Sequence, residues 1–324
     1  MSLATDAKDT LPQLASADPT ARSAGYAMVT TLFVNGNGRD LAIAEIVLPA
    51  LFAALEHDPH ALAPIATAAH GLFGARAYPE ALRCIDVLLA DTGAGDALSR
   101  KGPPWEDRAE PFTRERERAL FRLFRYECLL AAGRLEDAAA TLPEALAGAA
   151  VLPTPFKLSP SIYEWGTPDD FVLRARIRAS RALRLWAAGR DAAAFRKVPK
   201  KLHPKPVEAK RIRGLARALT ESYLPELDAS LSRFAPYKPG IVPDLTVADQ
   251  RALQDFRAEG YAEAGMIARD EGDSTRAARL LATAHWILAI HHHGLGAGVE
   301  PDHREAILAL APTPALVPAT RPEP

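Results

Sequence analysis

Apolar residues recur every three or four positions along most of the chain. This period is typical of helices that bury one face, whereas the two-residue alternation of a half-buried strand is nearly absent. The pattern therefore predicts an all-α protein. The predicted helices span residues 20–34, 40–57, 60–74, 78–91, 113–132, 135–149, 169–188, 190–198, 206–222, 224–235, 246–270, 274–293 and 301–310. Pro49 and Pro143 lie inside two of these ranges, so those two helices are expected to be kinked or divided there.

Four segments share the pattern of a helical hairpin, in which a turn residue is followed five positions later by alanine. The pairs of turn residue and alanine are Arg76 with Ala81, Gly133 with Ala138, Gly189 with Ala194, and Gly272 with Ala277. Glycine tolerates the positive φ that ends a helix, and a small side chain lets the second helix approach closely. Further positions of the pattern are occupied by Ala145, Ala284, Tyr261 and Gly265. These segments resemble the tetratricopeptide-type helical hairpin, although successive turn residues lie 57, 56 and 83 residues apart rather than about 34.

The N-terminal part of the chain repeats in a different way. Asp18-Pro19 and Asp58-Pro59 each follow an apolar stretch, and the two pairs are 40 residues apart. Aspartate followed by proline supplies an N-cap oxygen and a preset φ for the first helical turn. This arrangement is similar to a HEAT-like unit. Together the two resemblances imply stacked antiparallel helical hairpins, in an α-solenoid or a curled helical array.

The same observations suggest a division of the chain. We expect a HEAT-like region at 1–92, a long loop at 93–111, a tetratricopeptide-like region at 112–310 and a disordered, proline-rich tail at 311–324. A second long loop, at 152–168, interrupts the tetratricopeptide-like region. Connections of this length either contact a partner or serve as hinges, because most helix–helix loops have only about two to eight residues.

Composition indicates the cellular compartment and the source that we expect for the protein. The N-terminus lacks the apolar segment of a secretory signal, and no stretch reaches the roughly twenty apolar residues of a membrane-spanning helix. Cys84 and Cys128 are too few for a disulfide framework, so both are expected to be reduced and buried. We expect a cytoplasmic protein that does not enter membranes. Abundant alanine, arginine and proline with few lysines favour a bacterial source.

Positive charge is concentrated between Arg196 and Arg217, although the whole chain has a net charge of only −1. This basic segment carries nine basic residues and one acid, Glu208. The basic residues are Arg196, Lys197, Lys200, Lys201, Lys205, Lys210, Arg211, Arg213 and Arg217. Such a cluster attracts an acidic protein surface, phosphate or nucleic acid. Only Phe195 supplies an aromatic ring nearby, which weighs against a single-strand binder. The alternative to a binding role is a solvated charged face around a proline-rich turn formed by Pro199, Pro204 and Pro206.

Three aromatic residues complete the candidate partner-binding set. Trp105 lies in the first long loop, and Tyr163 and Trp165 lie in the second. Large aromatic side chains in loops either pin the loop to the helices or anchor a partner protein.

The sequence offers no support for a catalytic residue, a metal ligand or a cofactor. It has no nucleophile elbow, no P-loop and no dinucleotide-binding glycine motif after a strand. His291–His293 cannot bind one ion together, because consecutive helical residues point in different directions. These histidines, with His285 and His303, are expected to be favourable charges near a helix C-terminus.

Two smaller groups have alternative readings. His57 and His60 flank Asp58-Pro59, with Glu56 adjacent, and mark either an interhelical turn or a surface metal site. Asp169 and Asp170 are interpreted as acids at a helix N-terminus, with acid–base chemistry as the alternative.

The sequence thus favours a non-enzymatic α-helical repeat protein that binds another macromolecule. A protein partner is the leading hypothesis, and the resemblance implies a scaffold, adaptor or immunity-type inhibitor. A nucleic-acid-binding array that uses residues 196–217 is the first alternative. An enzyme whose pocket is assembled from distant helices is the second.

Overall fold

The computed structural model describes residues 3–34, 40–90, 114–149, 167–193, 198–232, 255–290 and 299–310. Within these ranges the chain forms twelve α-helices and two 3-10 turns and contains no strand, which confirms the all-α prediction. The α-helices are α1 (Leu3–Leu14), α2 (Pro19–Val34), α3 (Asp40–Leu55), α4 (Leu62–Gly74), α5 (Tyr78–Ala90), α6 (Arg114–Ala131), α7 (Leu135–Ala149), α8 (Pro168–Ala187), α9 (Pro206–Leu231), α11 (Asp255–Asp270), α12 (Ser274–Ile290) and α13 (Pro301–Leu310). The 3-10 turns are η1 (Pro59–Ala61) and η2 (Lys200–Leu202).

The chain divides into two compact units. Unit 1 comprises residues 1–175 and 188–204, and unit 2 comprises residues 176–187 and 205–324. Helix α8 therefore contributes its first two turns to unit 1 and the rest of its length to unit 2.

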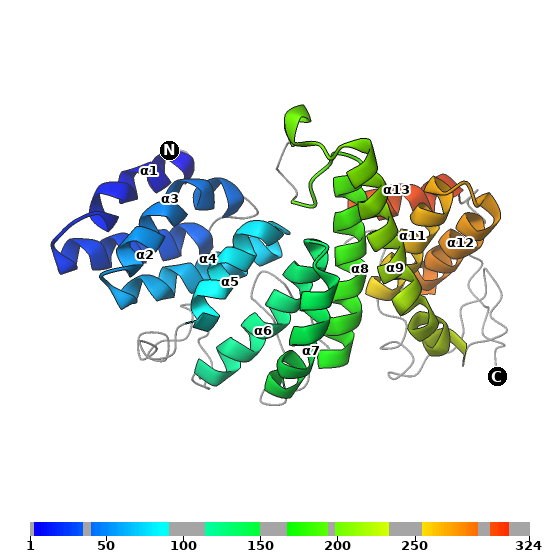
Figure 1. The fold of residues 1–324 in the computed structure, drawn as a ribbon, viewed down its shortest axis with the longest axis horizontal. Helices are drawn as coiled ribbons and strands as arrows, with labels where there is room; N and C mark the ends of the chain where they lie inside the picture. The colour runs from blue at the N-terminus through cyan, green and yellow to red at the C-terminus, as the bar shows by residue number, and fades with distance from the viewer. Residues whose placement is uncertain are drawn as a thin grey trace, which may run out of the picture. The chain divides into compact units, whose positions relative to one another are not determined.

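Unit 1 is built from helices that pack on their neighbours in the sequence. Contacts join α1 to α2 and α3, α4 to α2, α3 and α5, and α6 to α5 and α7 (Figure 1). Its core contains a stack of aromatic rings, in which the centroids of Phe73 and Phe124 are 4.0 Å apart. Both Asp-Pro sequences cap helices as predicted. Asp18 accepts a hydrogen bond from the Thr20 amide and Asp58 from the His60 amide, each at 3.0 Å.

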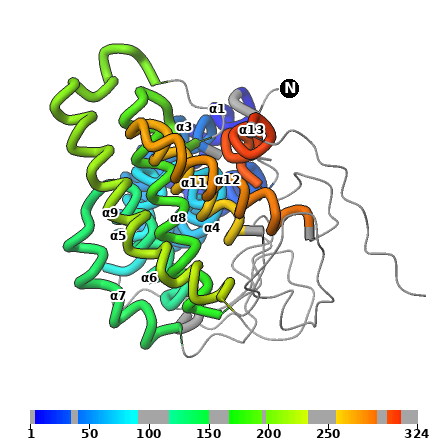
Figure 2. Tube along the Cα trace, turned by 90° about the vertical axis from the view of Figure 1, so that its right-hand side faces the viewer, coloured from blue at the N-terminus to red at the C-terminus, as the bar shows by residue number. Residues whose placement is uncertain are grey.

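Unit 2 is built around α11. Helices α9, α12 and α13 all contact it, and α13 also packs on α12 (Figure 2). Gly265 permits the closest approach between α11 and α12, because a Cβ atom there would lie 2.7 Å from Cγ of Leu281. The part of α8 in this unit contacts α9 through Ser180, whose hydroxyl lies 2.9 Å from that of Thr220.

The four predicted turn residues all adopt positive φ: 62° at Arg76, 72° at Gly133 and Gly189, and 85° at Gly272. Three of the turns also share one hydrogen bond, from the amide after the turn residue to the carbonyl five residues earlier. The donor and acceptor residues are Ala77 and Leu72, Arg134 and Leu129, and Asp273 and Ala268, each pair at 2.9 Å. This is the Schellman motif that ends a helix.

The alanines that follow these turns are buried as the hairpin pattern predicts. Ala81 and Ala138 are fully buried, and Ala277 is 3% exposed. Ala194, in the same place after Gly189, lies outside the described residues.

Three sequence predictions about helices are corrected. Residues 190–193 and 198 are not helical; the Asp191 side chain instead accepts a hydrogen bond from the Ala193 amide at 2.9 Å, and Pro199 follows. The two helices predicted at 206–222 and 224–235 are one helix, α9, which runs through Pro225. Helix α1, before residue 20, was not predicted.

The structure also tests the predictions for the prolines within helices and for the two cysteines. Helices α3 and α7 continue through Pro49 and Pro143 and are not divided. Cys84 and Cys128 are free and buried, as predicted, and burial raises the pKa of Cys84 to about 12. Residues 93–111, 152–166 and 311–324 and His291–His293 lie outside the described ranges.

Candidate functional site

The basic residues of α9 lie at its N-terminal end, in unit 2. Lys205 is the N-cap residue and makes no side-chain capping bond, and Pro206 occupies the first helical position. Lys210, Arg211 and Arg213 follow on the exposed surface of the next two turns. The N-terminal end of a helix carries a partial positive charge, so these cations add to a potential that is already positive.

Positive charge exceeds negative charge at this end of α9, where Glu208 is the acid of the first turn. Within the described ranges, no carboxylate forms an ion pair with Lys205, Lys210, Arg211 or Arg213. Arg217, one turn further on, is paired: its Nε donates to Glu221 at 2.8 Å and its guanidinium lies 3.5 Å from Glu271. The first turn also exposes an apolar side chain, Val207, at 85%. We call Lys205, Val207, Lys210, Arg211 and Arg213 the basic face of α9.

The other predicted partner-binding residues belong to unit 1 or lie outside the described residues. Lys200 and Lys201 are exposed in η2, which belongs to unit 1. Lys197, Trp105, Tyr163 and Trp165 lie outside the described residues.

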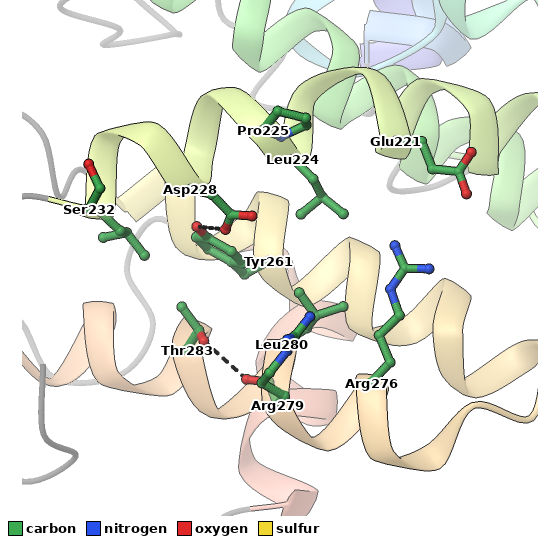
Figure 3. A pocket seen from close by; sticks show the side chains of 11 residues that line it. Glu221, Leu224, Pro225, Asp228, Ser232, Tyr261, Arg276, Arg279, Leu280 and Thr283 are labelled. Atoms are coloured by element: carbon green, nitrogen blue, oxygen red, sulfur yellow. Dashed lines mark hydrogen bonds between the residues drawn. The ribbon is translucent and has the colours of Figure 1, made fainter. Parts of the chain in front are cut away.

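A cleft of about 500 Å³ lies further along α9, between α9, α11 and α12 (Figure 3). It is lined by Glu221, Leu224, Pro225, Asp228, Leu231, Ser232, Tyr261, Arg276, Arg279, Leu280 and Thr283. Lys210, Arg213 and Arg217 precede the α9 lining residues at helical spacings of three and four. Part of the basic face and one wall of the cleft therefore form a single stripe along α9.

The two walls of the cleft carry opposite charges. Glu221 and Asp228 come from α9, and Arg276 and Arg279 come from α12 (Figure 3). The buried Tyr261 hydroxyl donates to Asp228 at 2.8 Å, which fixes that carboxylate at the edge of the cleft. In the part of the chain that the structure describes, neither arginine has an ion-pair partner. An unpaired guanidinium beside apolar side chains is a ready anion-binding group.

A second group of charges in unit 2 is buried. Glu263, fully buried on α11, accepts hydrogen bonds from Arg184 Nε at 2.8 Å and from His303 Nε2 at 2.8 Å. Asp302 accepts from Arg184 at 2.6 Å and from Arg181 at 2.9 Å. Glu259 accepts from the Glu300 amide at 2.8 Å. We call Arg181, Arg184, Glu259, Glu263, Asp302 and His303 the ionic cluster; it ties α13 to α8 and α11.

Charges within the ionic cluster shift the pKa of His303 and of the carboxylates of Glu259, Glu263 and Asp302 toward the ionised form. Burial alone lowers the pKa of His303, but its contacts with Glu259 and Glu263 outweigh burial and raise that pKa to about 9. Burial raises the pKa of Glu263, and Arg184 with His303 reverses this and brings it below its ordinary value. Every charge is paired, so the cluster is a structural anchor rather than a reactive site.

The ionic cluster corrects the prediction for His303, and the cluster itself was not predicted from the sequence. His303 is not a solvent-facing charge near a helix C-terminus; it is 1% exposed, at the N-terminal end of α13. The arginine-rich sequence of α8 was the available signal, since Arg181 and Arg184 lie one turn apart among apolar residues and need acidic partners when buried. Those partners lie about 80 and 120 residues away, beyond the reach of any local pattern.

The two smaller predicted groups, around Asp58 and at the start of α8, make contacts that stabilise turns and helix ends. His57 and His60 are exposed, while Asp58 binds Arg22 at 3.0 Å and the Tyr26 hydroxyl at 3.2 Å. Among the described residues, no three histidine, cysteine or acidic side chains are placed to hold a metal ion. Asp170 accepts from the Thr167 amide at 3.0 Å, which confirms it as an acid that caps the start of α8.

Comparison with known proteins adds nothing to this picture. No protein-family model, no curated protein and no solved structure matches the chain. None of the described helices is long and apolar enough to cross a membrane.

Proposed function

We propose that this protein is a non-enzymatic helical protein that binds an acidic surface of another protein through the basic face of α9. The observation that carries the proposal is the set of exposed, unpaired cations there. Four basic side chains stand at the N-terminal end of one helix without an acidic partner among the described residues.

The position of these cations argues against a purely structural role. A cation at the start of a helix is unfavourable by about 0.3–1 kcal/mol at an exposed position, and Lys205 occupies the N-cap of α9. Elsewhere in unit 2 the exposed Arg217 is balanced by Glu221. Glu208 is the acid of the first turn of α9, and the four cations leave an excess of positive charge that no ion pair neutralises in the described ranges, which is typical of a functional surface.

The composition of the basic face favours a protein over a nucleic acid. Val207 offers an apolar contact in the middle of the cations, as protein interfaces do. No aromatic side chain accompanies them on α9 before Tyr223, which is itself buried. Single-stranded nucleic acid is usually held by base stacking on such rings.

We also propose that the hairpins belong to a stacked array of tetratricopeptide-like and HEAT-like units, working in the bacterial cytoplasm as a scaffold, adaptor or immunity-type inhibitor. The repeated Schellman turns and the buried alanines after them support the hairpin part of this proposal. Arrays of this kind commonly bind other proteins.

The test compares partner capture by two variants. Tagged wild-type protein, Lys210→Gln/Arg213→Gln and the control Arg269→Gln/Arg304→Gln are expressed in the source cells, and co-purified proteins are quantified by mass spectrometry. Arg269 and Arg304 are exposed arginines of unit 2 outside the basic face. We expect an acidic protein that is captured by the wild type and the control and is reduced at least tenfold with the Lys210/Arg213 variant.

Two results would overturn the proposal. One is equal capture by all three proteins. The other is binding to a duplex or single-stranded oligonucleotide with a steep salt dependence that the Lys210/Arg213 variant loses, because that would identify a nucleic-acid partner.

A further inference from the structure

The cleft between α9, α11 and α12 has walls of opposite charge that do not neutralise each other. Arg276 extends from α12 toward α9, where Glu221 and Asp228 lie (Figure 3). Glu221 is already paired with Arg217, and Asp228 accepts the Tyr261 hydroxyl. Arg276 and Arg279 are left without an acidic partner among the described residues. The α12 wall therefore presents two unpaired guanidinium groups, one helical turn apart.

Buried apolar side chains form part of the surface between the walls. Leu224 and Leu231 from α9 and Leu280 from α12 line it, together with the ring of Tyr261. A ligand for this cleft needs an apolar group for that surface and an anionic group for the arginines. A cleft of about 500 Å³ is in the usual range of roughly 300–1,000 Å³ for such sites.

The acidic wall decides what kind of anion the cleft accepts. Glu221 and Asp228 repel a bare anion such as phosphate, and they repel a polyanionic chain more strongly. They are acceptors for N–H groups, and the Asp228 carboxylate accepts no hydrogen bond in the described ranges other than that from Tyr261. A peptide supplies all three parts: backbone N–H groups, an apolar side chain and a carboxylate.

We infer that this cleft binds a peptide segment of the partner protein in which an acidic residue stands next to an apolar one. The carboxylate binds Arg276 and Arg279, the apolar side chain covers Leu224 and Leu280, and backbone amides donate to Asp228. The inference rests on the proposed protein-binding function and deepens it, since the stripe along α9 leads from the basic face into the cleft.

The test is an unbiased peptide selection with purified full-length protein. A phage library of random heptapeptides is selected on the wild type, with Arg276→Gln/Arg279→Gln used to remove peptides that bind elsewhere. We expect the enriched peptides to share aspartate or glutamate beside leucine, isoleucine, methionine or phenylalanine. Circular dichroism of each variant verifies that it is folded.

Affinities of the best peptide then locate the site. Isothermal titration calorimetry should show at least a tenfold loss with Arg276→Gln/Arg279→Gln and no change with the control Arg269→Gln. Arg276→Lys/Arg279→Lys keeps both charges and should restore part of the affinity, which a loss of packing alone would not explain.

Other outcomes contradict the inference. These are no enrichment over the glutamine variant, a basic consensus, or binding of free glutamate or leucine as tight as that of the peptide, which would indicate a small-molecule site. The two proposals fail separately. If peptide binding depends on Arg276 and Arg279 but partner capture does not depend on Lys210 and Arg213, the peptide site in the cleft is supported and the role of the basic face is refuted.

Discussion

At the scale of single residues, two histidines show how burial and charge act in opposite directions. His70 packs between the rings of Phe121 and Phe124, with centroids 5.1 and 5.4 Å away, and its buried Nδ1 has no hydrogen-bond partner in the described ranges. Burial therefore lowers its pKa to about 4. His303 is 1% exposed, but two carboxylates face it and raise its pKa to about 9.

His70 makes the protein sensitive to acid. The unfolded chain binds a proton at His70 below about pH 6.5, while the folded chain resists until about pH 4, so stability falls as the pH drops between these values. Urea unfolding of the wild type should lose roughly 1–3 kcal/mol more over this range than that of His70→Leu. His57→Gln, at an exposed histidine, is the control and should follow the wild type. Parallel pH profiles for wild type and His70→Leu would refute this account of His70.

His303 has the opposite dependence. Its charged form stabilises the folded state fully below about pH 6.5, and that contribution disappears as the pH rises toward 9. The wild type should therefore lose roughly 2–3 kcal/mol more than His303→Gln between these values. At neutral pH, His303→Gln should also increase amide hydrogen exchange in α13, whereas Arg304→Gln on the same helix should not. Unchanged exchange in α13 would show that the ionic cluster does not anchor this helix.

At the scale of secondary structure, local chemistry predicts where helices end better than where they continue. The positive φ of Gly133, Gly189 and Gly272 follows directly from glycine at a helix end, and each was predicted. The chain around Pro225 was predicted to break, yet α9 runs through it and contacts α11 on both sides of the proline, through Tyr223 and Asp228. Residues 190–193 looked helical by composition, but the Asp191 side chain competes for the backbone amide of Ala193.

Helix α9 begins with Lys205, which makes no capping hydrogen bond. Replacing it tests whether this position is less stable than the sequence could make it. Aspartate in place of Lys205 should accept a hydrogen bond from an amide of the first turn and reduce the positive charge at this end. Lys205→Asp should stabilise unit 2 by about 1 kcal/mol, seen as a melting temperature about 2–4 °C higher. Lys201→Asp, outside any α-helix, is the control and should leave the melting temperature unchanged. A lower melting temperature for Lys205→Asp would mean that Lys205 makes a stabilising contact.

At the scale of the whole molecule, the sequence predicts the class of fold and the position of the basic residues but not the site. Periodicity is a local property, so nearly all helices could be recognised from it, and the excess of basic residues around Lys210 and Arg213 follows from counting charges along the sequence. The cleft lies between α9 and α12, and the ionic cluster links α8 to α13. Both depend on contacts between helices that are far apart in the sequence. No pattern in the sequence indicates that Arg276 lies opposite Glu221.

The central claim is that the basic face of α9 contacts another protein, and a photocross-link from Gly214 tests it most directly. A side chain at this position enters open space, between Lys210 and Arg217 on the same stripe. A photoreactive phenylalanine analogue at position 214 should give a discrete protease-sensitive adduct in the source cells, and Lys210→Gln/Arg213→Gln should abolish it. The same analogue at Ala278, exposed on α12 away from the cleft, should give none. No adduct from position 214, an equal adduct from position 278, or an adduct removed by nuclease would contradict the account.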